Sequence, residues 1–381
     1  MHIAFLTPEY PHEKVSHAAG IGTSIKNLAQ ALVMKGGVSV SVFVYSQNED
    51  LIIEEDNIKL HLIKRKHYSF FTWFFYRKHV QNYLNRFIKS DGIDLIEAPD
   101  WTGITAFMNL KAPLIVRFHG SDAYFCHLEN RKQKLKNYWF EKMGIMKAKA
   151  FIAPTDFAGR LTAKLFSIQN KKVKVIPNGI PLSDFNNTNP DDFESGLLIY
   201  IGTLIRKKGV LEFPGIMSML LKINPNARLI LIGADSFDVQ TQSRSTWELL
   251  QSKMDDNLKN KISYLGKVPY SEIKKYIQKA NVCVFPTFAE TQGMVTIESM
   301  AMQKAIVNSD IGWAKELIID GESGFLVHPE NHAIYSEKIA QLLENKDLVL
   351  EIGNNARKRA EAIFDIDKIV LQNIDFYKQQ L

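Results

Sequence analysis

The sequence predicts an α/β protein of two domains, each a doubly wound parallel sheet with helices on both faces. Three observations lead to this fold class. The 381 residues are too many for one ordinary core. Short apolar runs alternate with stretches of helical spacing along the chain. A polar, acidic and turn-rich stretch at 186–196 separates two such series, which predicts a hinge there and a ligand cleft between the domains.

Composition limits the class of protein further. A hydrophobic content of 46% and a charged content of 23% are typical of soluble globular proteins. No run of eighteen apolar residues occurs, the start of the chain lacks a basic leader, and the only cysteines are Cys126 and Cys283. We therefore expect a cytoplasmic protein. The net charge of +6 favours an anionic partner such as a nucleotide, a phospholipid surface or nucleic acid.

The first domain, expected at 1–185, begins with a strand at 2–7 and a helix at about 23–35. Gly20 and Gly22 are predicted to lie in the loop before this helix, where bare backbone can approach a phosphate or sugar. The glycines do not fit the dinucleotide fingerprint, because about twelve residues separate them from the strand. An ordinary flexible loop with a helix cap remains an equal alternative. Further strands are predicted at 38–45, 94–97, 114–118, 151–154 and 173–176.

His119 directly follows the predicted strand 114–118, at the edge of the sheet where ligands collect in this class of fold. Gly120 after it lets the chain turn sharply. A lone histidine is more often structural than catalytic, so the spacing alone leaves both roles open.

The segment 59–89 interleaves basic and aromatic side chains and contains no acidic residue. Such a segment can lie in a membrane interface, with its rings among the headgroups and its cations on anionic lipid. It can equally form a helix whose aromatic rings pack on the first domain while the cations stay in water. Stacking on nucleic acid is a distant third reading, and we expect no nucleic-acid partner.

The second domain, expected at 196–364, repeats the alternation with strands at 197–201, 227–232, 262–265, 282–285, 305–308 and 324–327. The strand 282–285 leads through a polar loop that contains Glu290 into a helix at 294–302 that contains Glu298. The N-terminus of that helix suits a phosphate group. A spacing of eight residues is not a clean same-face spacing, so the two acids are expected to have different tasks.

Several motifs now agree in order along nearly the whole chain: FHGSD at 118–122, IPNGI at 176–180, YIGTLIRKKG at 200–209, YLGKVP at 264–269, FAETQGMVTIESMAM at 288–302 and DGESGFLV at 320–327. Together they resemble the retaining, nucleotide-sugar-dependent glycosyltransferases of family four, the glycosyl transferases group 1. The resemblance implies the GT-B fold, in which two Rossmann-like domains face a cleft. It also implies that a C-terminal helix at 365–381 crosses back to the first domain.

The resemblance implies catalytic roles for three residues. Lys208 would neutralise the leaving diphosphate, Glu290 would bind the transferred sugar, and His119 would lie beside that sugar. Glu298 would hold the ribose hydroxyls of the donor through its carboxylate. The other implied donor contacts are Gly20 and Gly22 over the phosphates, the base-contacting backbone at Val268, and the backbone N–H groups around Gly293, Met294 and Val295.

One position departs from the family pattern. The family commonly has an arginine where this chain has Thr203. Arg206, in the same loop, is our hypothesis for the missing cation, and a solvated loop charge is an equal alternative. No Asp-x-Asp is placed for a divalent ion, so we expect neither a metal nor a cofactor apart from the donor.

The predicted function is retaining, metal-independent transfer of a hexose-type sugar from a nucleoside diphosphate sugar, of UDP or GDP type, to a hydroxyl. The acceptor would be a glycan, a lipid-linked molecule or a small molecule in cell-envelope polysaccharide or glycolipid synthesis. Peripheral attachment to the inner face of the membrane through 59–89 stays open. The alternatives are a sugar-phosphate synthase or phosphorylase with the same fold, and a non-catalytic, membrane-associated binding protein.

Overall fold

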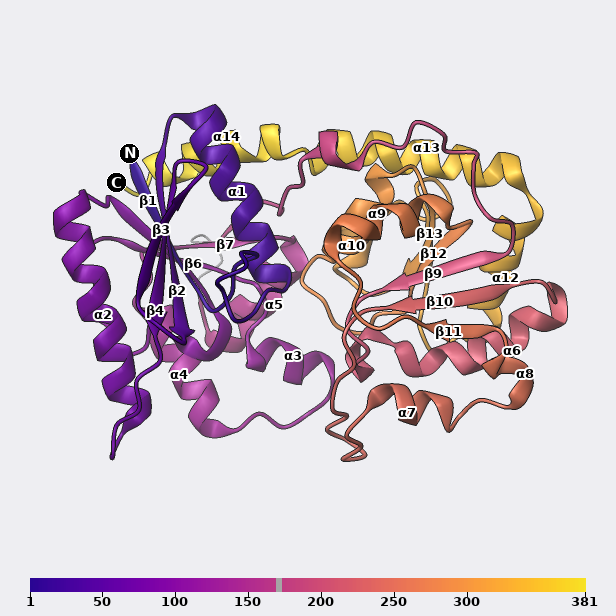
Figure 1. Cartoon of the computed structure of the whole chain (residues 1–381), viewed down its shortest axis with the longest axis horizontal. Helices are drawn as coiled ribbons and strands as arrows, with labels where there is room; N and C mark the ends of the chain where they lie inside the picture. The colour runs from indigo at the N-terminus through magenta and orange to yellow at the C-terminus, as the bar shows by residue number, and fades with distance from the viewer. Residues whose placement is uncertain (169–172) are drawn as a thin grey trace. The chain divides into compact units, whose positions relative to one another are not determined.

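The computed structural model describes residues 1–168 and 173–381 and confirms the predicted α/β class (Figure 1). The chain divides into two compact units. Unit 1 comprises Met1–Pro181 and Phe364–Leu381, and unit 2 comprises Leu182–Ile363. The sequence predicted a domain change across 186–196, whereas the chain enters unit 2 at Leu182. The side chain of Asn187 is buried there and donates to the Met302 carbonyl oxygen at 3.0 Å.

The sheet of unit 1 has the strand order β3-β4-β2-β1-β5-β6-β7-β8, and all its pairings are parallel except β3 with β4. Its strands are β1 (His2–Thr7), β2 (Ser39–Gln47), β3 (Leu51–Glu55), β4 (Ile58–Lys64), β5 (Leu95–Pro99), β6 (Leu114–Arg117), β7 (Ala150–Ala153) and β8 (Val173–Val175). The strands β1, β5, β6 and β7 are buried on both faces, as a parallel sheet between helices requires, and they are mostly apolar. Glu97 in β5 and Arg117 in β6 are buried charged exceptions.

Two hydrophobic clusters cover the two faces of this sheet. One cluster joins the sheet to α1 (Gly20–Gly36) and α14 (Ile366–Lys378). The other joins it to α2 (Thr72–Asp91), α3 (Asp122–Leu128), α4 (Leu135–Met146) and α5 (Asp156–Phe166). The last helix of the chain therefore completes the core of the first unit, as the fold prediction requires.

The sheet of unit 2 is parallel throughout, with the order β11-β10-β9-β12-β13-β14. Its strands are β9 (Leu197–Ile201), β10 (Arg228–Ile232), β11 (Ile262–Tyr264), β12 (Val282–Phe285), β13 (Ala305–Ser309) and β14 (Phe325–Val327). Its helices are α6 (Phe213–Ile223), α7 (Thr246–Gln251), α8 (Asp256–Lys259), α9 (Tyr270–Lys279), α10 (Met294–Ala301), α11 (Ala314–Leu317), α12 (His332–Glu344) and α13 (Lys346–Ile363).

The strand order of unit 2 reverses between β9 and β12, because β10 lies on one side of β9 and β12 on the other. In open α/β sheets ligands bind beyond the carboxyl ends of the strands at such a switch point. The two loops that begin there are 202–209, after β9, and 286–293, after β12. These loops contain five of the twelve residues that the sequence predicted for the site: Thr203, Arg206, Lys208, Glu290 and Gly293.

Candidate functional site

The two switch-point loops of unit 2 contact each other directly. Gly209 ends a short 3₁₀ helix at Arg206–Lys208 in a left-handed conformation, with φ of 70°. A Cβ at this position would collide with the Pro286 carbonyl oxygen, so only glycine permits the approach. The backbone N–H groups of Phe288 and Ala289 donate to the Lys207 carbonyl oxygen at 2.9 and 3.2 Å.

This contact brings Lys208 and Glu290 together, although 82 residues separate them in the chain. The ammonium group of Lys208 donates to the carboxylate oxygen Oε1 of Glu290, and both side chains are about four-fifths buried. Burial, together with the neighbouring charge of Lys207, lowers the pKa of Lys208 to about 7. The loop pair thus holds a partly desolvated cation at the position where the sequence predicted the diphosphate.

The helix α10 begins directly after the second loop. Gly293 precedes it in a left-handed conformation, with φ of 87°, beside the ring of Trp313. The backbone N–H groups of the first turn of a helix have no partner within the helix, so those of Met294 and Val295 are suited to contact an anion. The structure therefore brings the predicted residues Gly293, Met294 and Val295 to the same edge of the sheet as Lys208 and Glu290.

Glu298 lies within α10 and its side chain is buried. Its Oε1 atom accepts a hydrogen bond of 2.7 Å from the hydroxyl of Tyr270, the first residue of α9. Burial raises the pKa of Glu298 to about 7, although the Tyr270 hydroxyl and the charge of Lys274 favour the ionised carboxylate. Tyr270 was not among the site residues predicted from the sequence. A tyrosine directly after the predicted base-contacting stretch, YLGKVP, was the available signal.

The structure gives Arg206 a different immediate partner from the one proposed. Its guanidinium forms two hydrogen bonds with the carboxylate of Asp238, at 2.9 and 2.8 Å. Asp238 is buried, and the hydrogen bond from Arg206 is the main reason that its pKa is lowered to about 2. Thr203 is exposed, and its carbonyl oxygen accepts from the Tyr200 hydroxyl at 3.1 Å. Val268 is half-buried in the connection between β11 and α9.

In unit 1, His119 follows β6 as predicted. Burial and the charge of Arg117 lower the pKa of His119 to about 3, so its imidazole is neutral near pH 7. Its backbone N–H donates to Asp100 Oδ1 at 2.9 Å. Asp100 follows β5 at the switch point of this sheet, between β1 and β5, and was not among the residues predicted from the sequence. The available signal was a carboxylate directly after the short buried strand LIEAP.

Asp100 is buried, and its Oδ2 atom has no hydrogen-bond partner among the described residues. Burial, followed by the charge of Glu141, raises the pKa of Asp100 to about 8, so the side chain is mainly protonated at pH 7. A protonated carboxyl group can donate through its free oxygen. Asp100 therefore fixes the backbone of His119, and its second oxygen has no partner within residues 1–168 and 173–381.

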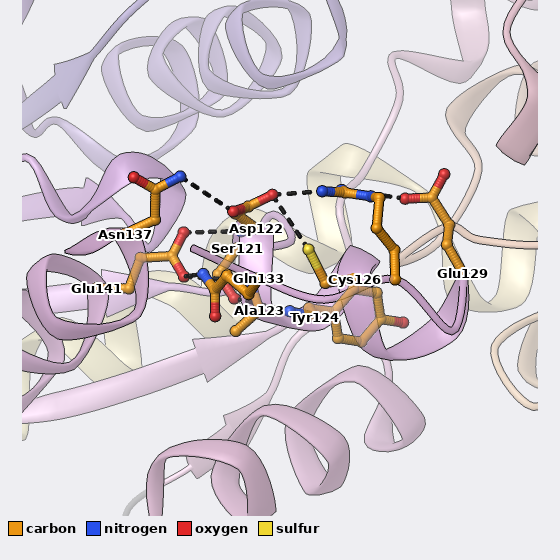
Figure 2. Close-up of polar contacts among 10 residues, drawn as sticks. Ser121, Asp122, Ala123, Tyr124, Cys126, Glu129, Gln133, Asn137 and Glu141 are labelled. Carbon is orange, nitrogen blue, oxygen red and sulfur yellow. Dashed lines mark hydrogen bonds and ion pairs between the residues drawn. The ribbon is translucent and has the colours of Figure 1, made fainter. Parts of the chain in front are cut away.

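The chain after His119 is fixed by a second buried carboxylate, which Figure 2 shows. Glu141 of α4 accepts the N–H groups of Asp122 and Ala123 at 2.7 and 3.1 Å, and so caps the start of α3. Gln133 donates to the same carboxylate at 2.8 Å. The carboxylate of Asp122 accepts in turn from Asn137, Arg131 and Cys126. These bonds make the loop at 119–122 a rigid part of unit 1.

The prediction for Gly20 and Gly22 was wrong in its local structure. The helix α1 begins at Gly20, so both residues belong to its first turn and not to a loop before it. The N–H of Gly22 donates to the carboxylate of Glu9 at 2.8 Å, so a side chain from thirteen residues earlier caps the helix. A Cβ on Gly22 would lie 2.9 Å from the Cα of Tyr10, so the glycine permits close packing of these two segments.

Comparison with known proteins gives two family matches that together span residues 18–359. The model described as Glycosyltransferase Family 4 matches residues 18–184, and the model described as Glycosyl transferases group 1 matches residues 185–359. Among curated proteins, an uncharacterized glycosyltransferase of Methanocaldococcus jannaschii is 24% identical over 93% of each chain. A capsular polysaccharide biosynthesis glycosyltransferase of Staphylococcus aureus is 24% identical over 60% of each chain.

Two solved structures share the fold over almost their whole length. Sucrose-phosphate synthase from Thermosynechococcus elongatus has a TM-score of 0.80 at 20% identity, covering 99% of this chain and 98% of its own. HepE of Anabaena, solved in complex with UDP-glucose, has a TM-score of 0.77 at 18% identity and covers 100% of both chains.

Proposed function

The chain belongs to the glycosyl transferases group 1, which have the GT-B fold, and on this basis we propose that it transfers a sugar from a nucleoside diphosphate sugar to an acceptor hydroxyl with retention of configuration. The observation that carries the proposal is the ammonium of Lys208 held beside Glu290 at the switch point of unit 2. A partly desolvated cation at that edge is suited to a diphosphate.

The proposed mechanism is electrostatic. As the bond between the sugar and the diphosphate breaks, negative charge grows on the leaving phosphate, and the Lys208 ammonium and the first N–H groups of α10 stabilise it without a metal. The diphosphate displaces Glu290 from Lys208, which frees this carboxylate for the sugar hydroxyls. Glu298 accepts from the ribose hydroxyls, and Tyr270 must then share or release Oε1. Arg206 orders the same loop through Asp238.

In unit 1 we propose that His119 acts as an uncharged imidazole that binds a sugar hydroxyl. With its pKa lowered to about 3, the imidazole can exchange hydrogen bonds with a sugar hydroxyl but carries no charge for the phosphate. Asp100 fixes its backbone and so acts as a positioning residue.

The names of two similar proteins, one solved with UDP-glucose and one of capsular polysaccharide biosynthesis, support a UDP-type donor and a glycan acceptor in polysaccharide synthesis. A lipid-linked acceptor in glycolipid synthesis is a proposal from the sequence alone. The second candidate function is that of a sugar-phosphate synthase, in which the acceptor is a sugar phosphate. It is favoured by the shared fold of sucrose-phosphate synthase. Both candidates use the same donor site and differ only in the acceptor. Cytoplasmic localisation and peripheral attachment to a membrane remain predictions from the sequence.

The proposal is tested by thermal unfolding with UDP-, GDP- and ADP-sugars. A donor at one hundred times its Kd stabilises the folded protein by about 2.7 kcal/mol, which raises the unfolding midpoint by roughly 5 to 10 °C for a domain of this size. Glu298→Ala should lose most of this increase. Transfer from the stabilising donor to hydroxyl acceptors or to sugar phosphates then separates the two candidates. If no nucleotide sugar raises the midpoint, the proposed function is wrong.

We expect donor affinity to peak near pH 7 and to fall on both sides. Below that pH Glu298 takes up a proton and loses acceptor strength for the ribose, because its pKa is raised to about 7. Above it Lys208 loses the charge that binds the diphosphate, because its pKa is lowered to about 7. Calorimetric Kd values measured from about one unit below to one unit above pH 7 test this expectation.

One variant and its control separate the acid limb from the alkaline limb of the curve of donor affinity against pH. Tyr270→Phe removes a hydrogen bond that favours ionised Glu298, so the acid limb should move to higher pH while the alkaline limb stays. Tyr276→Phe, on the same helix α9, is the matched control and should leave the profile unchanged. A Kd that is constant over this pH range, or an acid limb that moves to lower pH in Tyr270→Phe, would contradict the assignment of Glu298.

A further inference from the structure

The basic residues of the chain are strongly concentrated. The segments 59–89 and 131–149 contain fifteen of its 47 lysines and arginines but only one of its 41 acidic residues, Glu141. The rest of the chain therefore carries a net charge of −8, although the whole chain carries +6. Glu141 is fully buried and caps α3, so it does not offset the cations at the surface. The net positive charge of the protein thus comes from these two segments.

The fold brings the two segments together, which the sequence did not reveal. The ring of Trp73 in α2 lies 5.0 Å from the ring of Phe140 in α4, centroid to centroid. The ammonium of Lys136 lies 5.6 Å from the centroids of both rings, and the guanidinium of Arg77 lies 4.6 Å from that of Phe140. The start of α2 accordingly packs against α4, and the two helices lie near each other in unit 1 (Figure 1).

This surface exposes large apolar side chains. We define the basic–aromatic face by six of them, each between 44% and 79% exposed: Phe70, Phe71, Phe75, Leu135, Trp139 and Met146. The three in α4 follow the spacing i, i+4 and i+11, so they form one stripe along that helix. Lys142 belongs to the same stripe, and its ammonium lies 5.7 Å from the centroid of the Trp139 ring. The opposite side of α4, with Gly144 and Ile145, is buried in the unit.

Phe71 adds a separate observation. It caps the start of α2 in a left-handed conformation, with φ of 48°, which is strained for a bulky residue and costs roughly 1–3 kcal/mol. The strain holds an exposed phenyl ring next to an exposed Phe70 at one corner of the face. A glycine or asparagine would adopt this conformation with less strain, and neither would present a ring.

We infer that the basic–aromatic face binds the surface of an anionic lipid bilayer, with the aromatic rings among the headgroups and the lysines on the lipid phosphates. Rings at the surface beside long cationic side chains, without an exposed acid in either segment, are the composition that such an interface requires. A second copy of the chain fits poorly, because two such faces would repel each other. No helix of residues 1–168 and 173–381 is long and apolar enough to cross a membrane.

The inference does not depend on the proposed transfer reaction, and its test has a separate readout. The full-length protein is sedimented with vesicles of phosphatidylcholine, with and without phosphatidylglycerol. It should partition onto the anionic vesicles only, and raising the salt concentration should release it. Stabilisation by a nucleotide sugar, measured without vesicles, reports on the donor site and should be unaffected by changes in the face.

Two double variants of the basic–aromatic face, each with a matched control, test whether this face contacts the vesicle. Leu135→Ser with Trp139→Ser should weaken partition onto the anionic vesicles at least about tenfold, because apolar burial is lost. Lys132→Gln with Lys134→Gln should weaken it roughly 25-fold, about fivefold for each cation. The matched controls change exposed residues elsewhere, Met34→Ser with Leu371→Ser and Lys222→Gln with Lys253→Gln, and should partition as the natural protein does. All four have exposed sites, so unchanged unfolding midpoints will show that they fold.

Three results would overturn the inference. One is equal partition onto neutral and anionic vesicles, and another is equal loss in the face variants and their controls. The third is a dimer in solution that Leu135→Ser with Trp139→Ser dissociates, which would assign the face to a second copy of the chain.

Discussion

Lys208→Ala is expected to lower the rate of sugar transfer by about 100- to 1,000-fold at saturating donor, the effect of removing one preorganised group that stabilises charge in a transition state. The ammonium of Lys208 is buried against Glu290 by the two loops at the switch point. Water that enters in its place cannot supply a fixed positive charge. Steady-state kinetics with the donor identified by thermal stabilisation measure the effect.

Lys207→Ala is the matched control, because it removes the adjacent cation while its backbone carbonyl still joins the two loops. It should retain most of the activity. Glu290→Gln leaves the cation in place and should weaken sugar recognition more than diphosphate binding. If Lys208→Ala transfers sugar at a near-normal rate, Lys208 does not stabilise the leaving diphosphate, whether or not Lys207→Ala is active.

Arg117→Met is expected to destabilise unit 1 by about 3–5 kcal/mol, the usual cost of leaving one partner of a buried ion pair alone. The guanidinium of Arg117 in β6 contacts the carboxylate of Glu97 in β5 at 2.6 and 3.1 Å, and both side chains are almost completely buried. The same guanidinium donates to Asn373 at 2.6 Å, and the Tyr377 hydroxyl donates to Glu97 at 2.7 Å. Urea unfolding with an unchanged slope measures the loss.

The surface pair Arg160 and Asp156, in the same unit, gives a matched control. Both side chains are at least half exposed, so Arg160→Met should cost about 0–1 kcal/mol. Adding Glu97→Gln to Arg117→Met removes the unpaired charge and should restore part of the lost stability. If Arg117→Met costs no more than Arg160→Met, the buried network contributes nothing to the attachment of α14.

The main elements of the fold were predictable because buried parallel strands are short apolar runs with clear ends. The bounds of β1, β9 and β12 agree with the sequence prediction to the residue. The hairpin of β3 and β4 was missed. Its two turn residues, Asp56 and Asn57, both have positive φ, at 53° and 59°, in a turn that usually contains glycine. The strand β3, with the sequence LIIEE, is also short and largely exposed at the edge of the sheet, so its three apolar residues do not stand out as a buried strand.

The candidate site was predictable only as a set of residues. The sequence selected Lys208, Glu290 and Glu298, but their partners come from distant segments. The cap of α1 by Glu9, the hydrogen bond from Tyr270 to Glu298 and the ion pair of Arg206 with Asp238 all depend on which strands are neighbours. Strand order is set by packing of the whole sheet, and spacing along the chain does not determine it.

The path of the chain also determines the order in which the molecule can be completed during its synthesis. Unit 2 is one continuous stretch, whereas unit 1 needs Asn373 and Tyr377 near the end of the chain to complete its buried polar network. Domains usually fold one after another as they leave the ribosome, beginning with the first. Because α14 follows unit 2 in the chain, unit 1 can be completed only after unit 2 has been synthesised, and until then the buried charges of Arg117 and Glu97 lack their partners from α14.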